Sequence, residues 1–104
     1  MSQERLVKIE RRIERIKAEL AAIGDMRPGS LTKQYKDPGS RSGAYHQLSY
    51  RLDRHSRTEY IRREALPDIR RRVMNYKRFK KLCAEWIAIG IEHSKLTMKL
   101  TPRQ

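Results

Sequence analysis

Hydrophobic residues in the first part of the chain recur at alternating steps of three and four positions. They are Leu6, Ile9, Ile13, Ile16, Leu20 and Ile23. This spacing is that of the a and d positions of a coiled coil, which lie along one side of a helix. Gly24 can take the left-handed conformation that ends a helix. The pattern therefore predicts a helix within residues 1–24, with an apolar seam that needs a partner.

Between residues 25 and 63 the pattern changes to alternation at every second position. One face of the longest alternating run would carry His46, Leu48, Tyr50 and Leu52. Shorter alternating runs lie at residues 31–35 and 57–62, and two Pro-Gly dipeptides mark turns near their ends. This part of the chain is predicted to form a three-stranded antiparallel β-meander.

The steps of three and four return in residues 64–100 and predict one long amphipathic helix. Its apolar side would carry Leu66, Ile69, Val73, Tyr76, Phe79, Leu82 or Cys83, Trp86, Ile89 or Gly90, His93, Leu96 and Leu100. Pro67 suits the first turn, where a backbone N–H is not needed. The alternative is a helix that frays after Gly90. A helix of this length spans roughly 50 Å, which is more than so small a sheet can cover.

These elements predict one α+β domain over residues 1–104. We expect the two helices to pair with each other, and the pairing to continue into a homodimer through their apolar seams. The expected oligomer interface consists of Leu6, Ile9, Ile13, Ile16, Leu20 and Trp86.

A net charge of +13, from 25 basic and 12 acidic residues, favours a polyanionic partner. Residues 65–104 carry the largest share, +7 from ten basic and three acidic residues, and residues 69–81 within them hold seven basic side chains and no acidic one. At 100° per residue, an arc about 120° wide holds Arg70, Arg71, Lys77, Arg78 and Lys81. Such a face can follow nucleic-acid phosphates. The alternatives are a solvated face that only keeps the protein in solution, and a contact with an acidic protein.

The predicted meander adds further arginines, of which Arg51, Arg54 and Arg57 would extend the nucleic-acid surface. They alternate with Tyr45, Tyr50 and Tyr60, which could stack on bases. The commoner role of such tyrosines is in a core between sheet and helix, and both roles stay open for Tyr45 and Tyr60.

Catalytic and metal chemistry find little support. The three histidines fall on different predicted elements without cysteines or carboxylates at ligand spacing, so we expect no metal and no cofactor. Ser30 has no base nearby in sequence, and no phosphate-binding glycine motif occurs. We expect a protein that is not an enzyme. Cys83 is the single cysteine and no apolar run is long enough for a bilayer, so we expect a cytoplasmic protein without a membrane segment.

Four segments together carry a family resemblance: "MRPGSLTKQY", "PGSRSGAYHQLSY", "RTEYIRRE" and "NYKRFKKL". The chain resembles, over about residues 24–96, an uncharacterised family of short prokaryotic proteins with an Arg-Pro-Gly-Ser-Leu and a Gly-x-Tyr pattern. Members are often found near transposase genes. Many carry cysteines around a Pro-Gly in the loop between the first two strands, whereas this chain has "KDPGSRSGAY" there, so no metal site is implied. The resemblance implies a mobile-element setting and no particular reaction.

The hypothesis from the sequence is an accessory protein of a mobile genetic element that binds nucleic acid, DNA more than RNA, through its basic helix face. The rival hypothesis is an adaptor or inhibitor that docks on a transposase, recombinase or nuclease through its apolar helical stripes.

Overall fold

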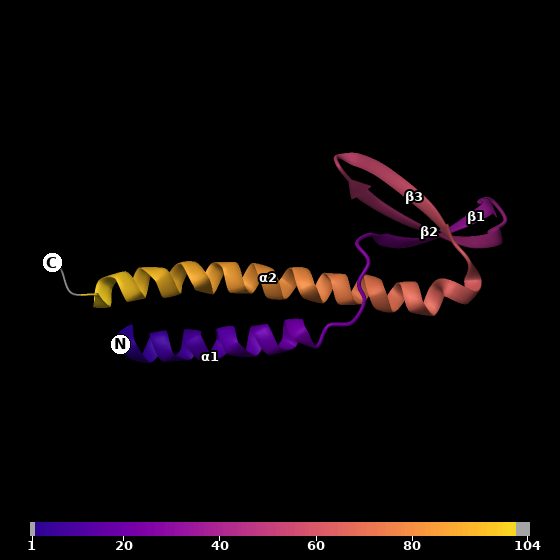
Figure 1. The fold of residues 1–104 in the computed structure, drawn as a ribbon. Coiled ribbons are helices and arrows are strands. Elements are labelled where there is room, and N and C mark those ends of the chain that lie inside the picture. Colours follow the sequence, from indigo (N-terminus) through magenta and orange to yellow (C-terminus); the bar gives the residue numbers. More distant parts are fainter. Residues whose placement is uncertain (1, 102–104) are drawn as a thin grey trace. The chain divides into compact units, whose positions relative to one another are not determined.

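The computed structural model of the protein describes residues 2–101 and confirms the predicted α+β order of elements (Figure 1). The elements are the helix α1 (Ser2–Ala21), the strands β1 (Ser30–Asp37), β2 (Ser42–Leu52) and β3 (His55–Ile61), a short 3-10 helix (Arg63–Ala65) and the helix α2 (Leu66–Leu100). The first helix ends at Ala21, ahead of Gly24. The second continues through Gly90 without interruption.

Contacts divide the chain into two compact units. Unit 1 consists of the chain up to Ile23 together with the part that begins at Arg78, and unit 2 runs from Gly24 to Lys77. The helix α2 contributes to both units, since its first turns belong to unit 2 and the rest to unit 1.

Unit 1 is an antiparallel pair of helices (Figure 1). Ile9 and Ile16 of α1 are 2% and 0% exposed, and Leu82 of α2 is equally enclosed at 5%. Ile9 and Ile16 of the predicted seam are thus buried within one chain and need no second copy to cover them, whereas Leu6, Ile13, Leu20 and Ile23 are half-buried. Homodimerisation stays a prediction.

Ion pairs beside the seam follow the heptad spacing. A step of seven residues along α1 matches a step of seven back along α2, as the pairs Arg5–Glu92, Arg12–Glu85 and Glu19–Arg78 show. Arg12 donates two hydrogen bonds to Glu85, at 2.5 and 2.6 Å. These bonds lower the pKa of the Glu85 carboxyl and raise that of the Arg12 guanidinium.

Unit 2 contains the three-stranded antiparallel sheet in the order β1-β2-β3. Residues directly opposite each other share a face of the sheet, so Leu31 of β1 and Leu48 of β2 lie together. The core formed with the first turns of α2 contains Leu48, Ile61, Leu66 and Val73, with Leu31, Ala65 and Ile69 packed around it. Burial of apolar side chains at this face holds the sheet against the helix, with each fully buried one contributing about 1.5–3 kcal/mol.

The segment before β1 needs its glycine. Gly29 has φ of +141°, and a Cβ placed on it would lie 2.8 Å from a methyl carbon of Leu48. A larger residue would therefore strain the backbone and push against the core. Arg27, two positions earlier, is also held in place. Its backbone N–H donates to the Arg72 carbonyl at 3.0 Å, and its side chain pairs with Glu59.

Candidate nucleic-acid interface

The five predicted basic residues of α2 are all exposed to solvent, but they differ in their partners. Arg71 donates to Asp68 at 2.6 Å, and Arg78 lies 3.9 Å from Glu19. Within the described residues, Arg70, Lys77 and Lys81 form no ion pair. Of the five predicted residues, Arg71 and Arg78 are thus paired with a carboxylate, and the other three are not.

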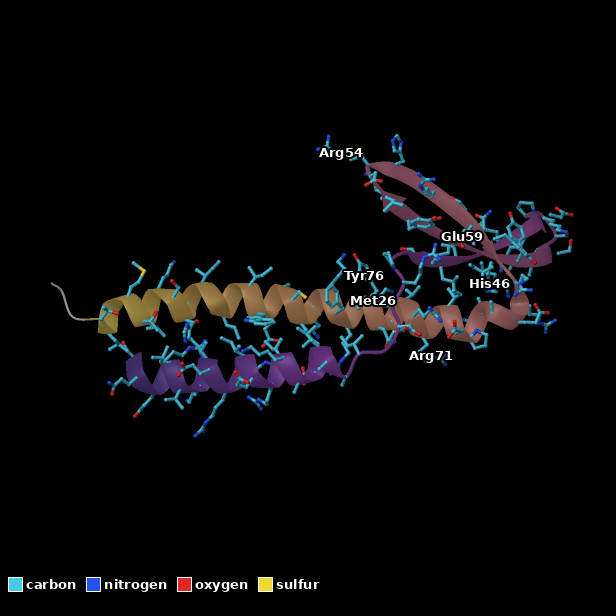
Figure 2. The ribbon with its side chains drawn as sticks, viewed as in Figure 1. Met26, His46, Arg54, Glu59, Arg71 and Tyr76 are labelled. Atoms are coloured by element: carbon cyan, nitrogen blue, oxygen red, sulfur yellow. The ribbon has the colours of Figure 1, made fainter. Side chains whose placement is uncertain are left out.

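Arg70 and Lys77 line a groove together with basic residues of the sheet. Lys33 of β1 and His46 of β2 form its opposite wall, and the volume is about 420 Å³. Figure 2 shows His46 on the side of the sheet that faces the first turns of α2. The floor is apolar and consists of Leu31, Val73 and Met74. Cations on an apolar floor are less screened than cations on an open surface.

The local sequence explains why these side chains meet. Lys33 is two positions from Leu31, so both point to the core face of β1, and Lys33 lies directly opposite His46 in the register. Arg70 and Lys77 flank the buried Val73 at helical steps of three and four.

A second hollow continues from the first at the edge of β2. The pairing of β2 with β3 stops at His46 and Ile61, so the edge of Tyr45 is free on that side. The hollow there has a volume of about 380 Å³ and shares Lys33 and His46 with the first. It adds Tyr45, Tyr60 and Arg63 to the lining.

We call the two hollows together the basic groove. Its cationic and titratable side chains are Lys33, His46, Arg63, Arg70 and Lys77. Among the described residues that line it, none is acidic. No ion pair of residues 2–101 engages Lys33, Arg63, Arg70 or Lys77. The basic groove thus holds four positively charged side chains that no described carboxylate pairs with.

Asp68, the acidic residue in the first turn of α2, is already paired with arginines. Asp68 accepts hydrogen bonds from Arg72 at 2.8 Å and from Arg71 at 2.6 Å. These bonds, chiefly that from Arg72, lower the pKa of Asp68. Asp68 remains charged near neutral pH, and its charge is balanced by side chains outside the basic groove.

The three predicted arginines of the sheet lie apart from the basic groove. Arg54 is at the tip of the β2–β3 hairpin, as Figure 2 shows, in a two-residue loop in which Asp53 and Arg54 both have positive φ. That conformation is the one a type I′ hairpin turn requires. Arg51 and Arg57 are exposed and lie on opposite faces of the hairpin, since Arg57 is paired with the neighbour of Arg51. They form a basic hairpin tip rather than one surface with α2.

The tyrosines of β2 and β3 divide between the two faces of the sheet. Tyr50 is half-buried on the core face, with the Arg27 guanidinium 4.6 Å from its ring centre. Tyr45 and Tyr60 lie on the other face, because Tyr60 is paired with Gln47 and Leu48 points the opposite way. Tyr60 is 66% exposed.

Sequence reasoning missed Lys33, His46 and Arg63 as site residues. The alternation of Leu31 and Lys33 was visible, and it placed Lys33 on the core face. What was lacking was the strand register and the side of α2 that covers the sheet, and neither follows from spacing alone.

In unit 1, α2 carries an exposed apolar stripe on the side that does not contact α1. Its largest members, Ile87, Ile91 and Met98, are 66%, 54% and 73% exposed. Cys83, Trp86, Gly90 and Ser94 complete a shallow groove along part of it, and Lys95 lies at its border. Neither described helix is long and apolar enough to pass through a bilayer.

Comparison with known proteins identifies the family. A family model described as a domain of unknown function, DUF6788, matches residues 6–71, so the chain belongs to this family. The matched part contains most of α1, the whole sheet and the first turns of α2, including Lys33, His46, Arg63 and Arg70. No curated protein and no solved structure matches the chain. The predicted membership of an uncharacterised family is confirmed, and the setting near transposase genes stays a prediction.

Proposed function

We propose that this member of the DUF6788 family binds nucleic acid through the basic groove of unit 2, as an accessory protein of a mobile genetic element. The observation that carries the proposal is that Lys33, Arg63, Arg70 and Lys77 line two hollows that share Lys33 and His46 and that no carboxylate lines. A polyanion that enters the groove gains contacts to four cations, and each neutralised phosphate releases condensed counterions.

The distribution of charge supports a polyanion more than a single small anion. The chain has a net charge of +13, and exposed arginines continue beyond the groove at Arg51, Arg54 and Arg57. A ligand that extends past the groove could use this hairpin as a further phosphate contact. Arg71, next to Arg70 on α2, is a further exposed cation of unit 2. We expect DNA as the ligand in a mobile-element setting.

Charge reversal inside the groove tests the proposal. The variant Lys33→Glu/Arg70→Glu/Lys77→Glu should lose binding to fluorescein-labelled DNA and RNA, whether duplex or single-stranded, at 100 mM salt. The matched control reverses Lys8, Arg11 and Lys36, three exposed cations that do not line the groove, and has the same net charge. Circular dichroism checks that both variants keep their helix content.

Two outcomes would refute the proposal. One is a wild-type protein that binds none of the four ligands in a salt-dependent manner. The other is a control variant that loses as much affinity as the groove variant, since binding would then depend on total charge and not on the basic groove.

The exposed apolar stripe favours a second candidate function, that of an adaptor for another protein. The occupant we expect is an amphipathic helix with acidic flanks, because Lys95 and Lys99 lie next to Ile91 and Met98, and Glu92, the acidic residue of this stretch, is already paired with Arg5. A second copy of this chain would bring lysines against lysines. Trp86 lines the stripe groove, so its fluorescence should shift when a synthetic acidic amphipathic peptide binds, and Ile87→Glu should abolish the shift. An unchanged Trp86 emission at saturating peptide refutes this candidate.

A further inference from the structure

We infer that the nucleic acid bound at the basic groove is single-stranded, with an unpaired base stacked on Tyr60 and Tyr45. This inference rests on the proposed function and specifies its ligand. It comes from the face of the sheet opposite to Leu48, which the proposal so far does not use. We call it the open face.

The open face has the composition of a base-binding platform. Its central residues are Tyr45, Gln47, Ser49, Thr58 and Tyr60. Sheet residues on this face carry no carboxylate within the described strands. Hydroxyl and amide groups can bond to base edges, and aromatic rings can stack on base faces.

The exposure of the tyrosines is the second observation. Burial in a core explains Tyr50, whereas Tyr60 exposes 66% of its surface on a strand whose residues from His55 to Tyr60 are all exposed. The ring centres of Tyr45 and Tyr60 are 6.4 Å apart, and the ring planes make an angle of 40°. The two rings are therefore not stacked face to face, and the exposed face of Tyr60 remains accessible to a planar ligand.

The position of the tyrosines next to the cations is the third observation. Tyr45 and Tyr60 border the same hollow as Lys33 and Arg63. A strand that places its phosphates in this hollow brings its bases past the free edge of β2 to the two rings. Cations that follow the backbone beside aromatic rings are the combination by which proteins bind single strands.

A duplex does not fit this arrangement equally well. Bases in a duplex are stacked on each other, so a tyrosine can reach a base face only where the base is unpaired. The phosphates of a duplex can still contact the groove cations. The inference therefore predicts a preference between ligands, which the charge alone does not.

A structural role is the competing explanation, since cross-strand aromatic pairs also stabilise sheets. The two explanations differ in one readout. A structural role of Tyr60 predicts that its loss weakens binding of single strands and duplexes alike, or weakens neither. Stacking predicts that the loss falls on single strands.

The experiment compares fluorescence anisotropy titrations of the full chain with labelled (dT)12, U12 and a 12-base-pair DNA duplex. The wild type should bind the single strands more tightly than the duplex. Tyr60→Ala should weaken binding of the single strands by about 5- to 150-fold and change the duplex affinity less than about twofold. Tyr60→Phe should recover most of the affinity that Tyr60→Ala loses. Ile87→Ala, which removes an equally exposed side chain (66%) of unit 1 away from the open face, serves as the control.

The outcomes separate the inference from the function on which it rests. Equal losses for strand and duplex in Tyr60→Ala, or no loss in either, overturn the inference, while the loss of binding in the groove charge variant would still support the proposed function. Failure of the wild type to bind any ligand overturns both. A preference for the duplex in the wild type also overturns the inference.

Discussion

Removing two of the four permanent cations of the basic groove should change how steeply binding depends on salt. The variant Arg70→Gln/Lys77→Gln removes both charges and leaves shorter, polar side chains in their place. Both residues are exposed and free of ion pairs within the described chain, so the substitution leaves no carboxylate without a partner.

The expected magnitude follows from the number of cations in the groove, which are Lys33, Arg63, Arg70 and Lys77. Each phosphate that a cation neutralises on a single strand contributes about −0.7 to the slope of log K against log salt. Four contacts give a slope of about −2.8, and two give about −1.4. Between 50 and 200 mM salt, the affinity should fall roughly 50-fold for the wild type and roughly 7-fold for the variant.

The assay is a series of anisotropy titrations at five salt concentrations over this range. The control Lys8→Gln/Arg11→Gln makes the same change in net charge on α1, and its slope should match that of the wild type. A variant slope within about 0.4 of the wild-type slope would mean that Arg70 and Lys77 do not contact phosphates. A control that changes as much as the variant would contradict the reasoning in another way, because salt dependence would then report overall charge.

Four further predictions concern the scaffold and its assembly. Leu48→Ala should destabilise unit 2 by about 2–5 kcal/mol, since Leu48 is fully buried, and urea unfolding followed by circular dichroism measures this loss. Gly29→Ala should cost about 1–3 kcal/mol because of its positive φ and its contact with Leu48; an unchanged midpoint would contradict it. The hydrogen bonds from Arg12 lower the pKa of Glu85 below its ordinary 4.5, so their stabilisation is present above that pH and lost as the pH falls through the folded-state pKa. Glu85→Gln should therefore flatten the acid side of the stability profile. Sedimentation equilibrium of the wild type should give twice the chain mass if the predicted homodimer forms, and a monomer would refute it.

The order and type of the elements could be predicted from the sequence because each has a clear period. The steps of three and four at residues 6–23 and the alternation at residues 44–52 translate directly into a helix and a strand. The buried side of the long helix was harder to predict. Positions such as Leu82 and Cys83, or Ile89 and Gly90, fit the same rhythm, and only the packing of α1 selects Leu82 for burial and leaves Ile87 exposed.

The candidate site could be predicted only in part for a similar reason. Arg70 and Lys77 were placed correctly on one helix face, and the pairing of Arg71 with Asp68 is a local contact at three residues' distance. The charges on the opposite wall depend on tertiary structure, since Lys33 reaches the groove through the register of β1 with β2. Arg78 likewise meets Glu19 only because the two helices are antiparallel.

The three heptad-spaced ion pairs of unit 1 also determine how the helices are aligned lengthwise. The polarity of the third pair is reversed, with the acid on α1 in Glu19–Arg78 and on α2 in the other two. If α1 slid by one heptad in one direction, Glu19 would meet Glu85, and in the other direction Arg12 would meet Arg78. Either slip replaces an attraction with a repulsion. No tight turn joins α1 to α2, because residues 22–65 with the whole sheet lie between them in the chain. The order of charges therefore does what a short loop does in an ordinary helical hairpin: it selects one alignment among several that the apolar seam alone would accept.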